Sequence, residues 1–125
     1  MLTSCPLIAF AATTDPQRAK AFYAETLGLR LVSEDGFALT FDAAGTQLRV
    51  AVVRALQPAP YTVLGWRVPD IVAATGELSR RGVIFERYDG MSQDAIGIWT
   101  SPSGAQLAWF RDPDGNTLSL TEFQA

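Results

Sequence analysis

The sequence predicts an α+β fold built from two βαβββ modules. Short β-rich segments alternate with only two stretches of helical periodicity, this order of segments occurs twice, and a proline-rich linker separates the two copies. The chain of 125 residues has the usual length of one domain. We therefore expect a single domain over residues 1–125, with module one at about 1–56, a linker at 57–61 and module two at about 62–125.

The first module starts with an apolar, strand-compatible segment from Pro6 to Thr14. Asp15 and Pro16 then supply an N-cap residue and a first-turn proline, which predicts the start of a helix. Gly28 stands where a helix commonly ends in a left-handed residue. Between these ends, residues that we expect to pin the helix onto a sheet recur at helical spacing: Ala19, Phe22, Tyr23 and Leu27.

Three further strands complete the first module. They are Leu29–Ser33, Phe37–Asp42 and Gln47–Val53, separated by turn-like stretches at residues 34–36 and 43–45. The linker that follows, Gln57-Pro58-Ala59-Pro60, cannot be a central strand because its two prolines lie so close together. The module therefore has the order strand, helix, strand, strand, strand.

The second module repeats this order. Val63–Val68 is predicted as a strand, and Asp70 as the N-cap of a helix that ends at Gly82. The remaining predicted strands are Val83–Arg87, Leu107–Arg111 and Thr117–Phe123, with a turn at residues 112–116. The capping aspartate and the terminal glycine are 28 − 15 = 13 residues apart in the first module and 82 − 70 = 12 in the second. Such a duplication suggests two modules that share one cavity.

One segment of the second module, Tyr88–Gly104, has no counterpart in the first. We interpret it as an extra loop that contains a short strand around Ile96–Thr100. Loops of this length often cover a binding site.

Charge and composition exclude several classes of partner. The formal net charge is −3 and the basic residues are scattered, so neither nucleic acid nor a membrane surface is an expected partner. The apolar segment at the N-terminus has no leading basic residues and is too short to span a bilayer. Cys5 is the only cysteine, which favours a cytoplasmic location, and without any histidine to activate it this thiol is not expected to be a nucleophile.

Two motifs point to a known family. The first is Asp15-Pro16, followed by Ala21-Phe22-Tyr23 and Leu27-Gly28-Leu29, and the second is the run from Trp109 to Asn116. They resemble the first helix and the closing hairpin of the vicinal-oxygen-chelate superfamily, which includes glyoxalases, bleomycin-resistance proteins and extradiol dioxygenases. The resemblance covers nearly the whole chain. It implies two βαβββ units that form a curved mixed sheet around a cavity, where the ligand and commonly a divalent metal lie, and it implies a homodimer.

The positions that hold the family's metal can be tested one by one. The resemblance places ligands, typically histidine and glutamate, on the first and last strands of each module, which here means Ile8, Val63, either Gln47 or Arg49, and Ser119. Two aliphatic side chains, an amide or guanidinium and a hydroxyl are not donors suited to a divalent transition metal. The aspartates of the Asp112–Asn116 run are explained by turn chemistry. We therefore expect no metal and no other cofactor.

The alternation of side chains along the strands predicts the lining of the cavity. It is mostly apolar with two arginines, Arg49 and Arg67, as candidates to bind an anion, although either could instead pair with a surface carboxylate. Trp99 and Trp109 are candidates to stack on a ligand, and Tyr88 begins a loop that could close over it. The complete set of predicted ligand-binding residues is Ile8, Phe10, Gln47, Arg49, Val63, Arg67, Tyr88, Trp99, Trp109 and Ser119.

Three functions fit these residues. The first is a binding protein without a metal site that holds a small aromatic or anionic molecule, as bleomycin-resistance proteins do. The second is a lyase, isomerase or dioxygenase that uses a metal with atypical ligands. The third is a metal-free enzyme in which Glu34, Glu86, Glu122 or Tyr88 acts as general acid or base. We favour the first, because it requires only a cavity.

Overall fold

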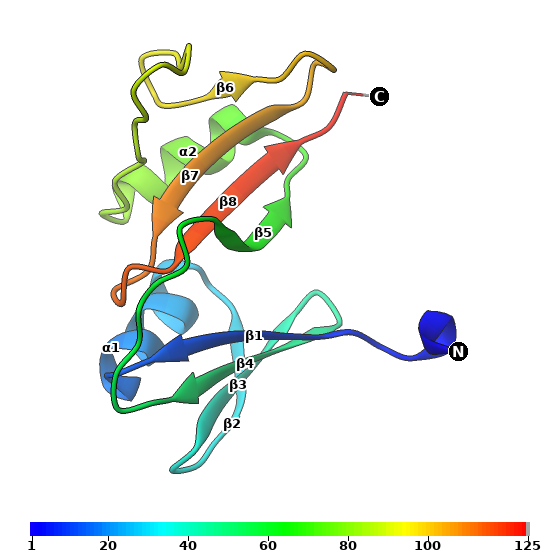
Figure 1. Ribbon diagram of the computed structural model, residues 1–125, viewed down its shortest axis with the longest axis vertical. Coiled ribbons are helices and arrows are strands. Elements are labelled where there is room, and N and C mark those ends of the chain that lie inside the picture. Colours follow the sequence, from blue (N-terminus) through cyan, green and yellow to red (C-terminus); the bar gives the residue numbers. More distant parts are fainter. Residues whose placement is uncertain (125) are drawn as a thin grey trace. The chain divides into compact units, whose positions relative to one another are not determined.

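The computed structural model describes residues 1–124 and is drawn in Figure 1. The chain divides into two compact units, which we call unit 1 (residues 1–57) and unit 2 (from Pro58 onward). Each unit contains one four-stranded mixed sheet. This arrangement confirms the predicted α+β class and its two βαβββ modules.

Unit 1 has the predicted order of elements. After a short 3-10 turn, η1 (Leu2–Ser4), come β1 (Ile8–Thr13), α1 (Pro16–Lys20), the π-helical continuation η2 (Ala21–Thr26), β2 (Arg30–Glu34), β3 (Ala38–Ala43) and β4 (Thr46–Val52). The sheet order is β1-β4-β3-β2, with β1 and β4 parallel and the other pairs antiparallel.

The predicted helix of unit 1 forms, although its second half is π-helical. The side chain of Asp15 accepts a hydrogen bond from the backbone N–H of Arg18 at 3.1 Å, which is the expected N-cap. Tyr23 is fully buried, with its ring 5.7 Å from the ring of Phe41 on β3. This contact attaches the helix to one face of the sheet.

Unit 2 consists of β5 (Thr62–Arg67), α2 (Ile71–Arg80), β6 (Trp99–Thr100), β7 (Gln106–Arg111) and β8 (Thr117–Glu122). Its sheet order is β5-β8-β7-β6, and only β5 and β8 are parallel. Figure 1 shows α2 lying across one face of this sheet. The buried side chains on that face are Ala108, Phe110, Leu118 and Leu120, and Ile71 of α2 is also buried.

One predicted strand, Val83–Arg87, is wrong. This segment makes only an isolated bridge between Phe85 and Phe110, with a hydrogen bond from Glu86 N to Trp109 O at 2.7 Å. The start of β7, at Gln106 and Leu107, is paired with β6, so the extra loop supplies the edge strand that we expected from residues 83–87. The short strand predicted around Ile96–Thr100 is confirmed over its last two residues.

The closing hairpin turn is held by a buried carboxylate. Asp112 Oδ1 accepts hydrogen bonds from Asp114 N at 3.0 Å and Asn116 N at 2.9 Å, and Oδ2 accepts from Asn116 Nδ2 at 2.8 Å. Gly115 has φ +88°, a conformation that glycine adopts without strain. The interpretation of Asp112–Asn116 as turn chemistry is confirmed.

A membrane-spanning helix is not found in residues 1–124: none of their helices has the length and apolar character that crossing a bilayer takes.

We predict that Asp112→Ala destabilises the fold by roughly 2–3 kcal/mol, because it removes a buried acceptor of three hydrogen bonds. Urea unfolding followed by tryptophan fluorescence measures the loss. Asp89→Ala, at an exposed position in the extra loop, is the control and should change the free energy of unfolding by less than about 0.5 kcal/mol. Equal stability of the two variants would contradict the role given to Asp112.

Candidate functional site

The candidate site lies on the face of the unit 2 sheet that α2 does not cover. Pairing sets Trp109 opposite Ser119 and Arg111 opposite Thr117 on β7 and β8, while Gly65 on β5 is opposite Ser119. Side chains directly opposite each other in neighbouring strands share one face of a sheet. We call this surface the site face.

Three aromatic side chains meet on the site face. Trp109 is the central member, with its ring 5.6 Å from that of Tyr88 in an edge-to-face arrangement and 6.1 Å from that of Trp99. These distances lie in the range of favourable aromatic pairs. The fold thus brings together three of the residues that the sequence singled out for ligand binding.

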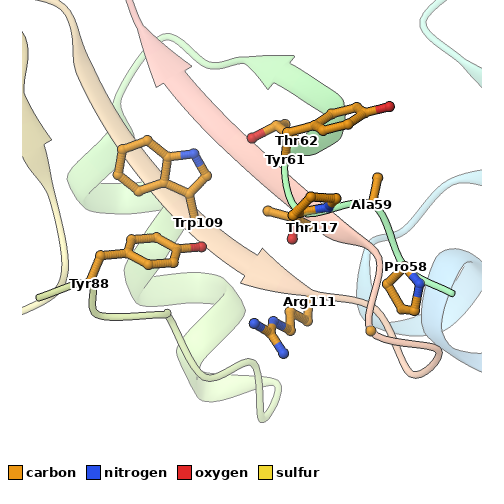
Figure 2. Close-up of a pocket in the computed structure, with 10 residues that line it drawn as sticks. Pro58, Ala59, Tyr61, Thr62, Tyr88, Trp109, Arg111 and Thr117 are labelled. Atoms are coloured by element: carbon orange, nitrogen blue, oxygen red, sulfur yellow. The ribbon is translucent and has the colours of Figure 1, made fainter.

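A pocket of about 510 Å³ opens beside this cluster, with Tyr88 and Trp109 on one side and the linker on the other (Figure 2). The volume is within the range of small-molecule sites. The lining residues are Pro58, Ala59, Pro60, Tyr61, Thr62, Tyr88, Trp109, Arg111, Gly115 and Thr117.

Arg111 supplies a cation to this pocket. Its Nε lies 3.5 Å from Glu86 Oε1, and the arginine side chain is 56% exposed. A pair this long and this accessible to water is weak. The guanidinium can therefore bind an anionic group of a ligand at little cost.

Tyr88 is electrostatically perturbed. Burial raises the pKa of its phenol above the ordinary value of 10.0, the carboxylate of Glu86 raises it further, and Arg111 opposes the shift. At neutral pH the phenol is thus a neutral hydrogen-bond donor at the wall of the pocket.

Several lining residues were missed by sequence reasoning. Arg111 was not singled out, although it alternates with Trp109 on one strand and this period of two was a usable signal. The linker, interpreted only as a connection, forms a wall of the pocket. At the start of β5, a register shift between Thr62 and Leu64 pairs Thr62 with Thr117, so Thr62 takes the place in the lining that we expected for Val63.

Two predicted site residues lie further along the site face. Ser119 is buried, and a methyl group added to Gly65 would stand 2.8 Å from Ser119 Oγ, so the serine packs closely under the glycine. Arg67 has its guanidinium carbon 5.2 Å from the centre of the Phe123 ring. It lines a second hollow with Phe123 and is absent from the lining beside Trp109.

The remaining predicted residues are in unit 1. Ile8 pairs with Gln47, and Phe10 pairs with Arg49, so these four side chains share the face opposite the helix. Arg49 is the counterpart of Ser119, because both lie 4 residues after a turn glycine (49 − 45 and 119 − 115). Phe10, the partner of Arg49, remains 60% exposed.

The family model for the glyoxalase/bleomycin resistance protein/dioxygenase superfamily matches residues 7–120. The chain belongs to this superfamily. No curated protein matches the sequence significantly.

Several solved structures have the same fold. A member of the superfamily from Sphaerobacter thermophilus DSM 20745 is 26% identical, with a TM-score of 0.75 over 98% of this chain and 99% of that one. TnmS3, an antibiotic binding protein from Streptomyces sp. CB03234, is 24% identical, with a TM-score of 0.73 over 99% of each chain. Lactoylglutathione lyase from Agrobacterium tumefaciens is 19% identical, with a TM-score of 0.74 over 95% of this chain and 93% of that one.

The residues at the four positions where the resemblance places metal ligands do not fit a divalent transition metal. With Arg49 as the counterpart of Ser119, the four positions hold two aliphatic side chains, a guanidinium and a hydroxyl. A guanidinium carries a permanent positive charge, which repels a metal ion. Residues 1–124 also contain no group of three or more carboxylate or thiol side chains placed to hold an ion.

The four candidate acid–base groups are in different surroundings. Glu34 pairs with Lys20 at 2.7 Å, and Glu122 Oε1 accepts a hydrogen bond from Ile71 N at 2.8 Å at the start of α2. Tyr88 lines the pocket, and Glu86 lies beside it through its pair with Arg111.

We predict that protein purified without chelator contains far less than one equivalent of zinc, nickel, iron or manganese, because the donors at the superfamily's positions are unsuited to these ions. Elemental analysis measures the content. Stoichiometric metal that is lost on Ser119→Ala would contradict this prediction.

We predict that Tyr88 ionises above pH 10, the ordinary tyrosine pKa, because burial disfavours its charged form. Because the folded state then holds the phenol proton more tightly than the unfolded state, the free energy of unfolding is highest below the unfolded-state pKa. It falls as pH rises from that value through the folded-state pKa. The difference in tyrosinate absorbance between the natural protein and Tyr88→Phe reports this titration. A midpoint at or below that of N-acetyltyrosinamide would refute the assignment.

Proposed function

We propose that this superfamily member is a small-molecule binding protein. It takes up a planar aromatic molecule with one anionic group in the pocket of unit 2, and it needs no metal to do so. The observation that carries this proposal is the position of Trp109 between Tyr88 and Trp99, at the wall of a pocket that also contains Arg111.

The chemistry of the lining supports this class of ligand. The indole of Trp109 offers an aromatic surface, and aromatic pairs contribute roughly 0.5–1.5 kcal/mol beyond the area that they bury. Arg111 offers a planar set of donors that matches a carboxylate. The hydroxyl of Tyr88, which is neutral at pH 7, is a further donor.

The fold neighbours are compatible with a role in binding. TnmS3, which has the same fold, is an antibiotic binding protein. A metal-dependent reaction of the kind suggested by the superfamily name would require donors that the four corresponding positions lack. A binding protein requires only the pocket and its lining.

The proposal extends to assembly and location. We infer that both units form one domain, that two copies of the chain form a homodimer, and that the protein acts in the cytoplasm, where its lone thiol stays reduced. Sedimentation equilibrium tests the dimer, and a monomer at all concentrations would remove that part of the proposal.

We predict that 2-naphthoate binds more tightly than its neutral isostere 2-naphthamide, because only the carboxylate can pair with Arg111. Arg111→Gln should weaken 2-naphthoate by roughly fivefold in Kd, about 1 kcal/mol after discounting for solvent screening, and should leave 2-naphthamide unchanged. Arg67→Gln is the matched control. Isothermal titration calorimetry gives both affinities, and an effect of Arg67→Gln alone would place the anion near Phe123 instead.

We predict that Trp109→Leu weakens both naphthyl probes by roughly two- to tenfold, because it removes the aromatic surface and keeps an apolar side chain. Phe37→Leu, at an 80% exposed position of unit 1, is the control. Fluorescence anisotropy of the naphthyl group measures binding, and equal affinity in both variants would exclude Trp109 from the site.

A further inference from the structure

The extra loop is organised by one amide side chain, that of Gln93. Its Oε1 accepts a hydrogen bond from Tyr88 N at 2.7 Å. Its Nε2 donates to the carbonyls of Glu86 and Gly97, both at 2.9 Å. The amide of Gln93 thus bonds to three backbone groups that lie between four and seven residues away in the sequence.

Each partner of this amide leads to a member of the aromatic cluster. Tyr88 belongs to the cluster, and Glu86, whose carbonyl accepts from the Gln93 amide, donates its backbone N–H to Trp109 O at 2.7 Å. Gly97 lies two residues before Trp99, and the backbone of Gln93 forms a bridge with Trp99. The amide therefore joins the segment that carries Tyr88 to the segment that carries Trp99.

Gly97 leaves little freedom in this arrangement. It is buried with φ +94°, and a side chain there would meet Phe85 Cβ at 3.3 Å. The carboxylate of the neighbouring Asp94 accepts hydrogen bonds within its own turn, from Ile96 N and Ile98 N. Asp94 therefore stabilises the turn, whereas Gln93 connects the two segments of the loop.

We propose that Gln93 is a positioning residue, which holds Tyr88 and Trp99 against Trp109 and so keeps the aromatic wall of the pocket, formed by Tyr88 and Trp109, in place before any ligand arrives. Preorganisation of this kind improves affinity because the side chains are ordered before binding. The use of this wall by a ligand rests on the function proposed above, but the positioning itself does not.

Two substitutions of Gln93 separate the hydrogen bonds of its amide from the size of its side chain. Gln93→Met preserves the length of the side chain and removes the amide donor and acceptor. Gln93→Glu keeps an acceptor for Tyr88 N but directs a carboxylate at two backbone carbonyls, which repel it. When the introduced carboxyl is protonated it can donate one hydrogen bond again, so acidification should partly restore the loop.

The test is circular dichroism of the ligand-free protein, in which the close pair of indoles at positions 99 and 109 gives an exciton-coupled signal. The loss of signal in Trp99→Phe defines the contribution of the pair. We expect Gln93→Met to lose this contribution, and Gln106→Met, a matched change on β7, to retain it. Gln93→Glu should lose it at neutral pH and regain part of it as pH falls through the pKa of the introduced carboxyl.

Retention of the signal in Gln93→Met would overturn the inference. If Gln93→Met does not fold, the pH dependence of Gln93→Glu decides instead, and a signal independent of pH would overturn it. Affinity for 2-naphthoate, measured in the same variants, separates the two proposals. A lost indole signal with unchanged affinity would support the positioning role of Gln93 and contradict the proposed binding site.

Discussion

The alternation of side chains along β7 and β8 is the constraint on which the site depends. Ala108, Phe110, Leu118 and Leu120 are buried on the face covered by α2. Because successive residues of a strand point to opposite faces, Trp109 and Ser119 must lie on the other side. A slip of one residue would exchange the two sets, so burial of the core fixes the composition of the site face.

Two side chains stabilise this arrangement through hydrogen bonds to the backbone. Asp112 closes the turn between β7 and β8 and so sets their register. Gln93 ties the extra loop to the same sheet through the segments that carry Tyr88 and Trp99. Core packing thus determines the face of the sheet on which Trp109 lies, and the extra loop places Tyr88 and Trp99 beside Trp109.

Local signals in the sequence predicted most of the fold. Helix starts at Asp15 and Asp70 and the closing turn at Asp112 follow from side chains that bond to backbone a few residues away. The register shift at Val63 and the bridge between Phe85 and Phe110 depend on contacts between distant residues, which periodicity does not encode. Trp99 and Trp109 could be named from the sequence as candidates to stack on a ligand. Their contact with each other and with Tyr88, and the position of the linker in the pocket, also depend on distant residues and could not be derived.

The proposed binding of a planar aromatic anion to the site face of unit 2, without a metal, is tested most directly by nitrogen-15 NMR of the protein in chelator, titrated with 2-naphthoate. We expect the largest shift changes at Tyr88 N–H, the indole N–H groups of Trp99 and Trp109, and Arg111 Nε–H. Shift changes that centre on Phe10 and Arg49, or that occur only after a metal is added, would contradict the claim.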